Sequence, residues 1–120
     1  MITNLAPNEV FVFGSNLAGR HGAGAARQAF MQFGAKMGVG EGLTGRCYAF
    51  PTLDGELRQV PISRIEASRD RLYATCENRP DQRFLLTKVG CGLAGYTEAT
   101  MRGLFTQPPA NLILPEDWNG

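Results

Sequence analysis

The chain has 120 residues, of which 43% are hydrophobic and 19% charged, and its formal net charge is +1. This length favours a single domain over residues 1–120, and the ordinary hydrophobic content argues against disorder. A charge so close to zero argues against a protein whose main task is to bind a nucleic-acid backbone. No apolar run approaches the length that spans a membrane, so no membrane partner is expected.

The first half of the chain predicts two strands and one helix. Apolar residues at 10–13 (VFVF) are typical of a buried strand, and a loop with four glycines follows at 14–24. Helix-forming residues at 25–35 predict a helix. A second glycine-rich segment at 34–45 is expected to be a loop, and a second strand at 47–50 (CYAF) ends before Pro51 and Thr52.

The second half predicts two helices and two more strands. An apolar stripe at helical spacing begins after Pro61 and ends near residues 78–80. A third strand at 84–89 (FLLTKV) leads into a glycine-rich loop at 90–96, a short helix that ends near Phe105, and a last strand at 111–114. This alternation predicts an α/β fold with a largely parallel or mixed sheet.

The cysteines are Cys47, Cys76 and Cys91, and the only histidine is His21. Without a CxxC pair or a second histidine, no structural metal site is expected, and nothing in the sequence calls for a cofactor. The first residues lack the pattern of a signal peptide, so the odd, widely spaced cysteines are typical of reduced thiols. We therefore expect a soluble, cytoplasmic protein.

Two glycine-rich loops, at 14–24 and 90–96, each follow a predicted strand and precede a predicted helix. In open α/β sheets, ligands bind beyond the carboxyl ends of the strands. Backbone N–H groups in such loops can surround an anion, and a helix N-terminus adds partial positive charge. The chain has no GxxxxGK[ST] motif, which argues against a P-loop nucleotidase. Residues 14–24 do not match GxGxxG, and no acidic residue follows them at the distance that a Rossmann ribose site requires. Two converging loops predict a site for a diphosphate.

The same loops resemble two blocks of the macro domain family, whose members bind ADP-ribose or its derivatives. Residues 12–17 (VFGSNL) and 22–26 (GAGAA) resemble the family's first block, and residues 88–96 (KVGCGLAGY) resemble its diphosphate-binding loop. The Gly-Cys-Gly-Leu motif resembles the loop of the family branch that contains the terminal ADP-ribose protein glycohydrolases. Residues 13–26 resemble a segment of small bacterial and phage proteins of this type. The resemblance implies a compact three-layer fold with a mixed, mostly parallel sheet. It also implies a free ADP-ribose-type ligand or an ADP-ribosylated macromolecule as partner.

The chain departs from those glycohydrolases at one reactive position. In that branch an aspartate follows the loop motif and attacks with the help of a lysine, whereas this chain has Ala94 there. Their covalent mechanism does not transfer, and Lys88 is not assigned the role of that lysine. A binding module, either a reader or a sequestering protein, is therefore the first hypothesis. An ADP-ribosyl hydrolase is the alternative, and a structural protein that retains only the fold is the third.

The candidate site residues have competing structural roles. By the resemblance, Asn16 would contact the distal ribose, or it could hydrogen-bond its own turn. His21 could carry a proton, because histidine titrates near neutrality, or be solvated. Cys91 could be a nucleophile or a small packing residue. Tyr96 could border a ribose or a base, or it could pack in the core. Thr52 could line the site because of its location just after a strand. The catalytic candidates are Asn16 and His21, and the ligand-binding candidates are Gly14, Ser15, Asn16, Gly22, Ala23, Gly24, Thr52, Gly90, Cys91, Gly92, Leu93, Ala94, Gly95 and Tyr96.

Overall fold

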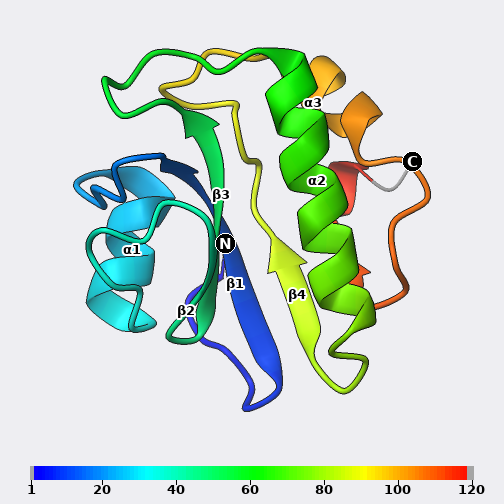
Figure 1. Ribbon diagram of the computed structural model, residues 1–120. Coiled ribbons are helices and arrows are strands. Elements are labelled where there is room, and N and C mark those ends of the chain that lie inside the picture. Colours follow the sequence, from blue (N-terminus) through cyan, green and yellow to red (C-terminus); the bar gives the residue numbers. More distant parts are fainter. Residues whose placement is uncertain (1, 119–120) are drawn as a thin grey trace.

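The computed structural model describes residues 2–118 and contains one sheet in the order β2-β3-β1-β4-β5 (Figure 1). The strand β1 at its centre is parallel to β3 and β4, β5 is parallel to β4, and β2 is antiparallel to β3. The strands are β1 (Glu9–Asn16), β2 (Gly42–Thr44), β3 (Cys47–Leu53), β4 (Arg83–Leu86) and β5 (Leu112–Ile113). The predicted mixed and mostly parallel sheet is thus confirmed.

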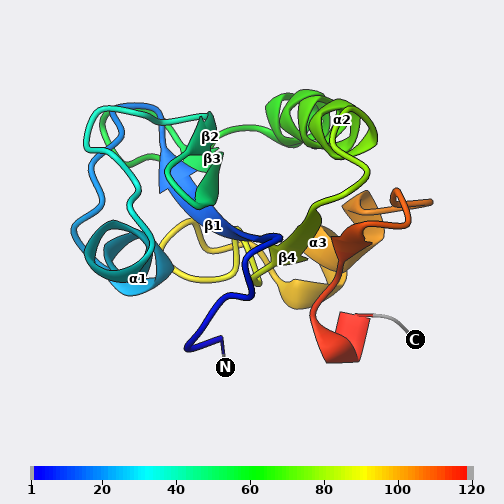
Figure 2. The same cartoon turned by 90° about the horizontal axis from the view of Figure 1, so that it is seen from below.

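Side chains of β1 alternate between two hydrophobic cores, one on each face of the sheet. Phe11 and Phe13 pack with α1 (Gly24–Gln32) on one face. Val10 and Val12 belong to the core on the other face, to which α2 (Ile62–Glu77) and α3 (Glu98–Leu104) contribute. Figures 1 and 2 show α1 and α2 on opposite sides of the central strands. The arrangement has three layers, as an α/β fold requires.

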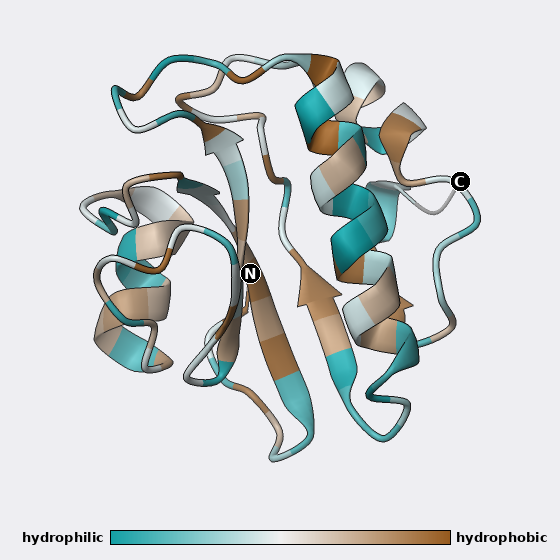
Figure 3. Ribbon diagram, in the orientation of Figure 1, coloured by the Kyte–Doolittle hydropathy of each residue, from teal (hydrophilic) through white to brown (hydrophobic). Residues whose placement is uncertain are grey.

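Hydropathy follows this layering. In Figure 3, β4 and the first half of β1 are hydrophobic after their hydrophilic first residues, where the chain enters the sheet. Helix α2 buries a stripe at helical spacing, which consists of Ile65, Ser68, Leu72 and Cys76. Among residues 2–118, no helix is long and apolar enough to cross a membrane.

Two strands extend further toward their carboxyl ends than the sequence predicts. The end of β1 at Gly14, Ser15 and Asn16 pairs with the end of β3 at residues 50–53. The expectation that β3 ends before Pro51 is wrong, because β2 pairs only with residues 47–49 and leaves Pro51 at a free edge, where its missing N–H costs no ladder hydrogen bond. Candidate residues from Gly14 to Asn16 and Thr52 therefore lie on strand ends.

Other boundaries also differ from the prediction. Strand β2 lies inside the expected loop at 34–45, held by its pairing with β3. Strand β4 ends at Leu86 and not at Val89, because Val89 N turns back to donate to Thr87 O (2.8 Å). Helix α1 ends at Gln32, two residues before Gly34 takes a φ of +79°.

Candidate functional site

A cleft of about 640 Å³ lies at the carboxyl ends of β1, β3 and β4. Of the parallel strands, β3 lies on one side of β1, and β4 and β5 lie on the other side. Such doubly wound sheets bind ligands at the switch point, which here lies between β1 and β4. The cleft is lined by Gly14, Ser15, Asn16, Arg20, Gly22, Ala23, Gly24, Ala25, Ala26, Thr52, Leu53, Leu57, Thr87, Lys88, Val89, Gly90, Gly92, Leu93 and Ala94.

Asn16 holds the turn that follows β1. Its Nδ2 donates to Arg20 O (2.8 Å) and its Oδ1 accepts from Arg20 N (3.0 Å). The side chain lines the cleft but its amide already closes its own turn, which is the structural role weighed for this residue. One donor hydrogen and one acceptor lone pair of the amide stay free for a ligand.

The N-terminus of α1 opens directly into the cleft. Residues 22–26 line it, and the N-cap residue Ala23 has no side chain that could satisfy the first helical N–H groups. Within residues 2–118, the N–H groups of Gly24, Ala25 and Ala26 have no protein acceptor. Free donors and the positive end of the helix dipole favour an anion at this wall of the cleft.

The loop at 88–95 forms the opposite wall. Gly90 takes a φ of +79°, a conformation that favours glycine, and a Cβ there would lie 2.9 Å from the end of the Met101 side chain on α3. The loop closes through Tyr96 N donating to Gly90 O (2.9 Å) and Gly95 N donating to Gly92 O (3.0 Å). In the described part of the chain, the N–H groups of Gly90, Gly92, Leu93 and Ala94 have no acceptor.

The charged side chains of the cleft are Arg20 and Lys88, both cationic. Within residues 2–118, the Arg20 guanidinium makes no ion pair or hydrogen bond. Lys88 Nζ lies 2.8 Å from Asp117 Oδ2 and 3.0 Å from Glu98 Oε1, and hydrogen bonds to these carboxylates raise the pKa of Lys88. These two carboxylates offset the charge of Lys88, so Arg20 is the charge that remains free. Since no described residue that lines the cleft carries a carboxylate, Arg20 favours an anionic ligand there.

Hydroxyl groups in the cleft differ in whether they are already bonded. Thr87 Oγ1 donates to Val12 O (2.8 Å), and Ser15 Oγ donates to Gly40 O. Thr52 is only 4% exposed, yet within residues 2–118 its Oγ1 makes no hydrogen bond. The Thr52 hydroxyl is therefore available to a ligand.

The rim of the cleft is apolar. Leu57, on the turn after β3, is 44% exposed, and Leu93, on the opposite loop, is 78% exposed. Leu57 has a φ of +63°, a conformation uncommon for residues other than glycine. No sequence pattern indicates Leu57 as a site residue, because its place depends on the turn at 54–58, where Leu57 N donates to Asp54 O (3.1 Å). Two exposed leucines suit a flat apolar ring such as a nucleobase.

Some predicted residues lie outside the cleft. The Tyr96 hydroxyl donates to Val60 O. Both Tyr96 and Cys91 pack against the hydrophobic core on the face of the sheet that α2 and α3 cover. Burial raises the pKa of the Cys91 thiol, which does not fit an activated nucleophile. Gly95 closes the second loop without lining the cleft.

His21 is not placed to carry a proton in the cleft. It is 1% exposed and not solvated, its Nε2 donates to Lys36 O (2.9 Å), and its ring stands edge-on to Phe13 at 5.2 Å. Its Nδ1 has no partner in the described residues. The structure gives no support to a catalytic role for His21, because its side chain does not line the cleft.

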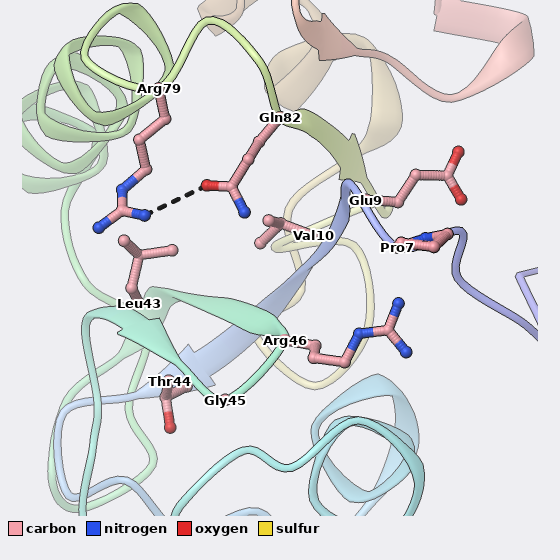
Figure 4. Close-up of a pocket in the computed structure, with 9 residues that line it drawn as sticks. All are labelled: Pro7, Glu9, Val10, Leu43, Thr44, Gly45, Arg46, Arg79 and Gln82. Carbon is pink, nitrogen blue, oxygen red and sulfur yellow. Dashed lines mark hydrogen bonds between the residues drawn. The ribbon is translucent and has the colours of Figure 1, made fainter.

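A second, smaller hollow of about 250 Å³ lies at the other end of the sheet (Figure 4). Its two arginines are already engaged: Arg46 Nη2 donates to Leu5 O (3.1 Å) and Ala6 O (2.8 Å), and Arg79 Nη1 donates to Gln82 Oε1 (3.3 Å). In Figure 4 the two guanidinium groups do not converge. This hollow is therefore a weaker candidate than the cleft.

The chain matches no family model, no curated protein and no solved structure. What the fold and the cleft define is an α/β protein with a cationic, glycine-lined cleft at the switch point of its sheet.

Proposed function

We propose that this protein binds ADP-ribose or a related NAD-derived nucleotide in the cleft, as a reader or a sequestering module. The observation that carries the proposal is the set of unpartnered backbone N–H groups on two facing walls, at the α1 N-terminus and on the loop at 88–95. Both walls come from the segments that resemble the two blocks of the macro domain family, the second of which is its diphosphate-binding loop. A diphosphate is the ligand group that such facing donors suit best.

The size and polarity of the cleft support a nucleotide. Its volume of about 640 Å³ falls within the range of about 300–1,000 Å³ that is usual for small-molecule sites. Arg20 adds a free positive charge, and the exposed leucines Leu57 and Leu93 add an apolar rim for a base. Together these groups match a ligand with an anionic centre and an aromatic end.

Binding without hydrolysis fits the lining better than catalysis. Among residues 2–118, no residue that lines the cleft carries a carboxylate, an imidazole or a thiol, and the catalytic aspartate and its helper are therefore not replaced by another such group there. The position of the aspartate in the glycohydrolases is Ala94, which does line the cleft. We expect no release of ADP-ribose from an ADP-ribosylated protein. Such release at an enzymatic rate would favour the hydrolase.

Calorimetric titration with ADP-ribose, with cyclic ADP-ribose and AMP alongside, tests the proposal. We expect a micromolar or tighter dissociation constant for ADP-ribose. Gly92→Glu should abolish this binding, because the new side chain has open space to occupy and places a carboxylate among the anion-binding N–H groups. Gly103→Glu on α3 is the matched control, since it adds the same side chain in open space outside the cleft. No heat with any of the nucleotides would refute the proposal.

A cytoplasmic location is part of the same proposal. The cysteines Cys47, Cys76 and Cys91 are free, and burial raises the pKa of Cys47 and Cys76 to about 12. Unpaired thiols fit a reducing compartment, where NAD-derived nucleotides are also found.

A further inference from the structure

We infer that Thr52, the Gly90 N–H group and the open space over Gly14 form a subsite that holds one phosphoryl oxygen of the ligand. The inference rests on the proposed function and deepens it, since it assigns the phosphate to a particular place on the floor of the cleft. This place lies where the ends of β1 and β3 meet the loop after β4.

The geometry around Gly14 brings two donors to one point. A methyl group added to Gly14 would lie 3.7 Å from Gly90 N and 3.8 Å from Thr52 Oγ1. Because Gly14 has no side chain, this point stays open to the cleft. A ligand oxygen above the Gly14 Cα, farther out than this methyl position and nearer to both donors, can accept a hydrogen bond from each of them.

Both donors lack a protein partner. Thr52 and Gly90 are buried as whole residues, and within residues 2–118 neither Thr52 Oγ1 nor Gly90 N makes a hydrogen bond. The nearby Thr87 hydroxyl, in contrast, donates to Val12 O. The Thr52 Oγ1 atom is open to the cleft, so a bound acceptor oxygen can take hydrogen bonds from both donors at once.

The donors also select the chemistry of the bound atom. A backbone N–H can only donate, so the oxygen that it contacts must accept, and the Thr52 hydroxyl can donate to the same atom. An anionic phosphoryl oxygen is the strongest such acceptor, because charge-assisted hydrogen bonds are shorter and stronger than neutral ones. We therefore expect adenosine, which has no phosphate, to bind much more weakly than ADP-ribose.

Three variants separate the subsite from the rest of the cleft. Thr52→Val removes the hydroxyl and keeps the shape, whereas Thr52→Ser restores the hydroxyl. Gly14→Ala puts a methyl group into the space through which the oxygen approaches the two donors, and its nearest contacts of 3.7 Å and 3.8 Å are ordinary van der Waals distances, so the fold should be kept. Losing a hydrogen bond to a charged oxygen should weaken ADP-ribose binding about tenfold in Thr52→Val and Gly14→Ala. Thr52→Ser should regain most of the affinity, and thermal unfolding checks that all three variants are folded.

The outcomes distinguish this inference from the proposed function. If wild-type protein binds ADP-ribose and Gly92→Glu does not, while Thr52→Val and Gly14→Ala bind as wild type, the subsite is refuted and the function stands. If wild-type protein binds no nucleotide, the proposed function fails. The subsite is then tested separately, by titration of the protein with pyrophosphate. A shift of the Gly90 amide resonance on titration with pyrophosphate, lost in Gly14→Ala, supports it, and an unmoved resonance overturns it.

Discussion

Asn111 connects the end of α2 to the start of β5 through one carboxamide group. Its Nδ2 lies 2.9 Å from Cys76 O, 3.0 Å from Arg79 O and 2.9 Å from Gln82 O. Because these carbonyls would lose a donor, we expect Asn111→Ala to lower the free energy of unfolding by about 1–3 kcal/mol. Urea unfolding measures this loss. Asn78→Ala is the control, since in the described residues that side chain makes no hydrogen bond; equal losses in both variants would contradict the role of Asn111.

The three cysteines should differ in reactivity according to burial. Burial raises the pKa of Cys47 and Cys76 to about 12, and burial also raises the pKa of Cys91, whose thiol is only partly covered. Since the thiolate is the reacting form, we expect a disulfide reagent at neutral pH to modify native protein slowly and at Cys91 alone. Absorbance of the released thiol should report all three groups after unfolding. Rapid labelling of Cys91 would instead indicate an activated nucleophile.

At the scale of elements, the connection from α1 to the β2–β3 hairpin depends on close contact between two glycines. Gly45 has a φ of +56°, and an added Cβ would overlap the carbonyl group of Gly34. We expect Gly45→Ala to lower the free energy of unfolding by at least about 2 kcal/mol, because both the dihedral and the contact oppose a side chain. Gly55→Ala should change it by about 0.5 kcal/mol or less, since its Cβ would meet nothing within 4 Å. Thermal unfolding compares the two, and similar melting temperatures would refute the packing argument.

The centres of the strands are predictable from the sequence, and their ends are not. Residues 10–13 and 47–50 are apolar on both faces, which indicates burial in a sheet without further information. Gly14–Asn16 and Pro51–Leu53 have turn-forming residues, and they are strands only because their ends pair with each other. Strand β2 is missed for a similar reason, since only its hairpin partner holds it.

The candidate site likewise has features that the sequence predicts and features that it does not. The two glycine loops could be located because they follow strands, and strand ends converge in an α/β sheet. Leu57 could not, because its position depends on the turn at 54–58. The burial of His21 was equally unpredictable, because its acceptor is Lys36 O, 15 residues along the chain. Local patterns therefore locate backbone features, and long-range contacts decide which side chains reach the cleft.

At the scale of the whole molecule, one ion-pair network connects the cleft to the last described element. Lys88, on the cleft wall, pairs with Glu98 on α3 and with Asp117 on the 3₁₀ helix η1 (Glu116–Trp118). Trp118 Nε1 donates to Glu98 Oε1 (3.2 Å), and its ring packs 6.2 Å from that of Phe105. The network thus holds η1 against α3 and the loop at 88–95.

Acid should weaken this network in a predictable direction. The hydrogen bond from Trp118 and the contact with Lys88 lower the pKa of Glu98 from its ordinary 4.5, and Lys88 lowers that of Asp117 from 3.8. A carboxyl with a lowered pKa in the folded state stabilises the protein above its ordinary pKa, and that contribution is lost as the pH falls through the lowered value. The contribution should therefore be complete at neutral pH, should begin to fall near the ordinary values of 4.5 and 3.8, and should be lost once the pH is below the lowered values.

Lys88→Met tests the network, and Lys36→Met is its matched control. Lys36 is the other lysine of the chain, and within residues 2–118 its side chain makes no ion pair. We expect Lys88→Met to melt at a lower temperature than Lys36→Met at neutral pH and at the same temperature in acid, where the carboxyls are protonated in both. Because the paired groups are exposed, added salt should reduce the difference at neutral pH. A difference between the two variants that persists unchanged into acid would show that the stabilisation does not come from the ion pairs of Lys88.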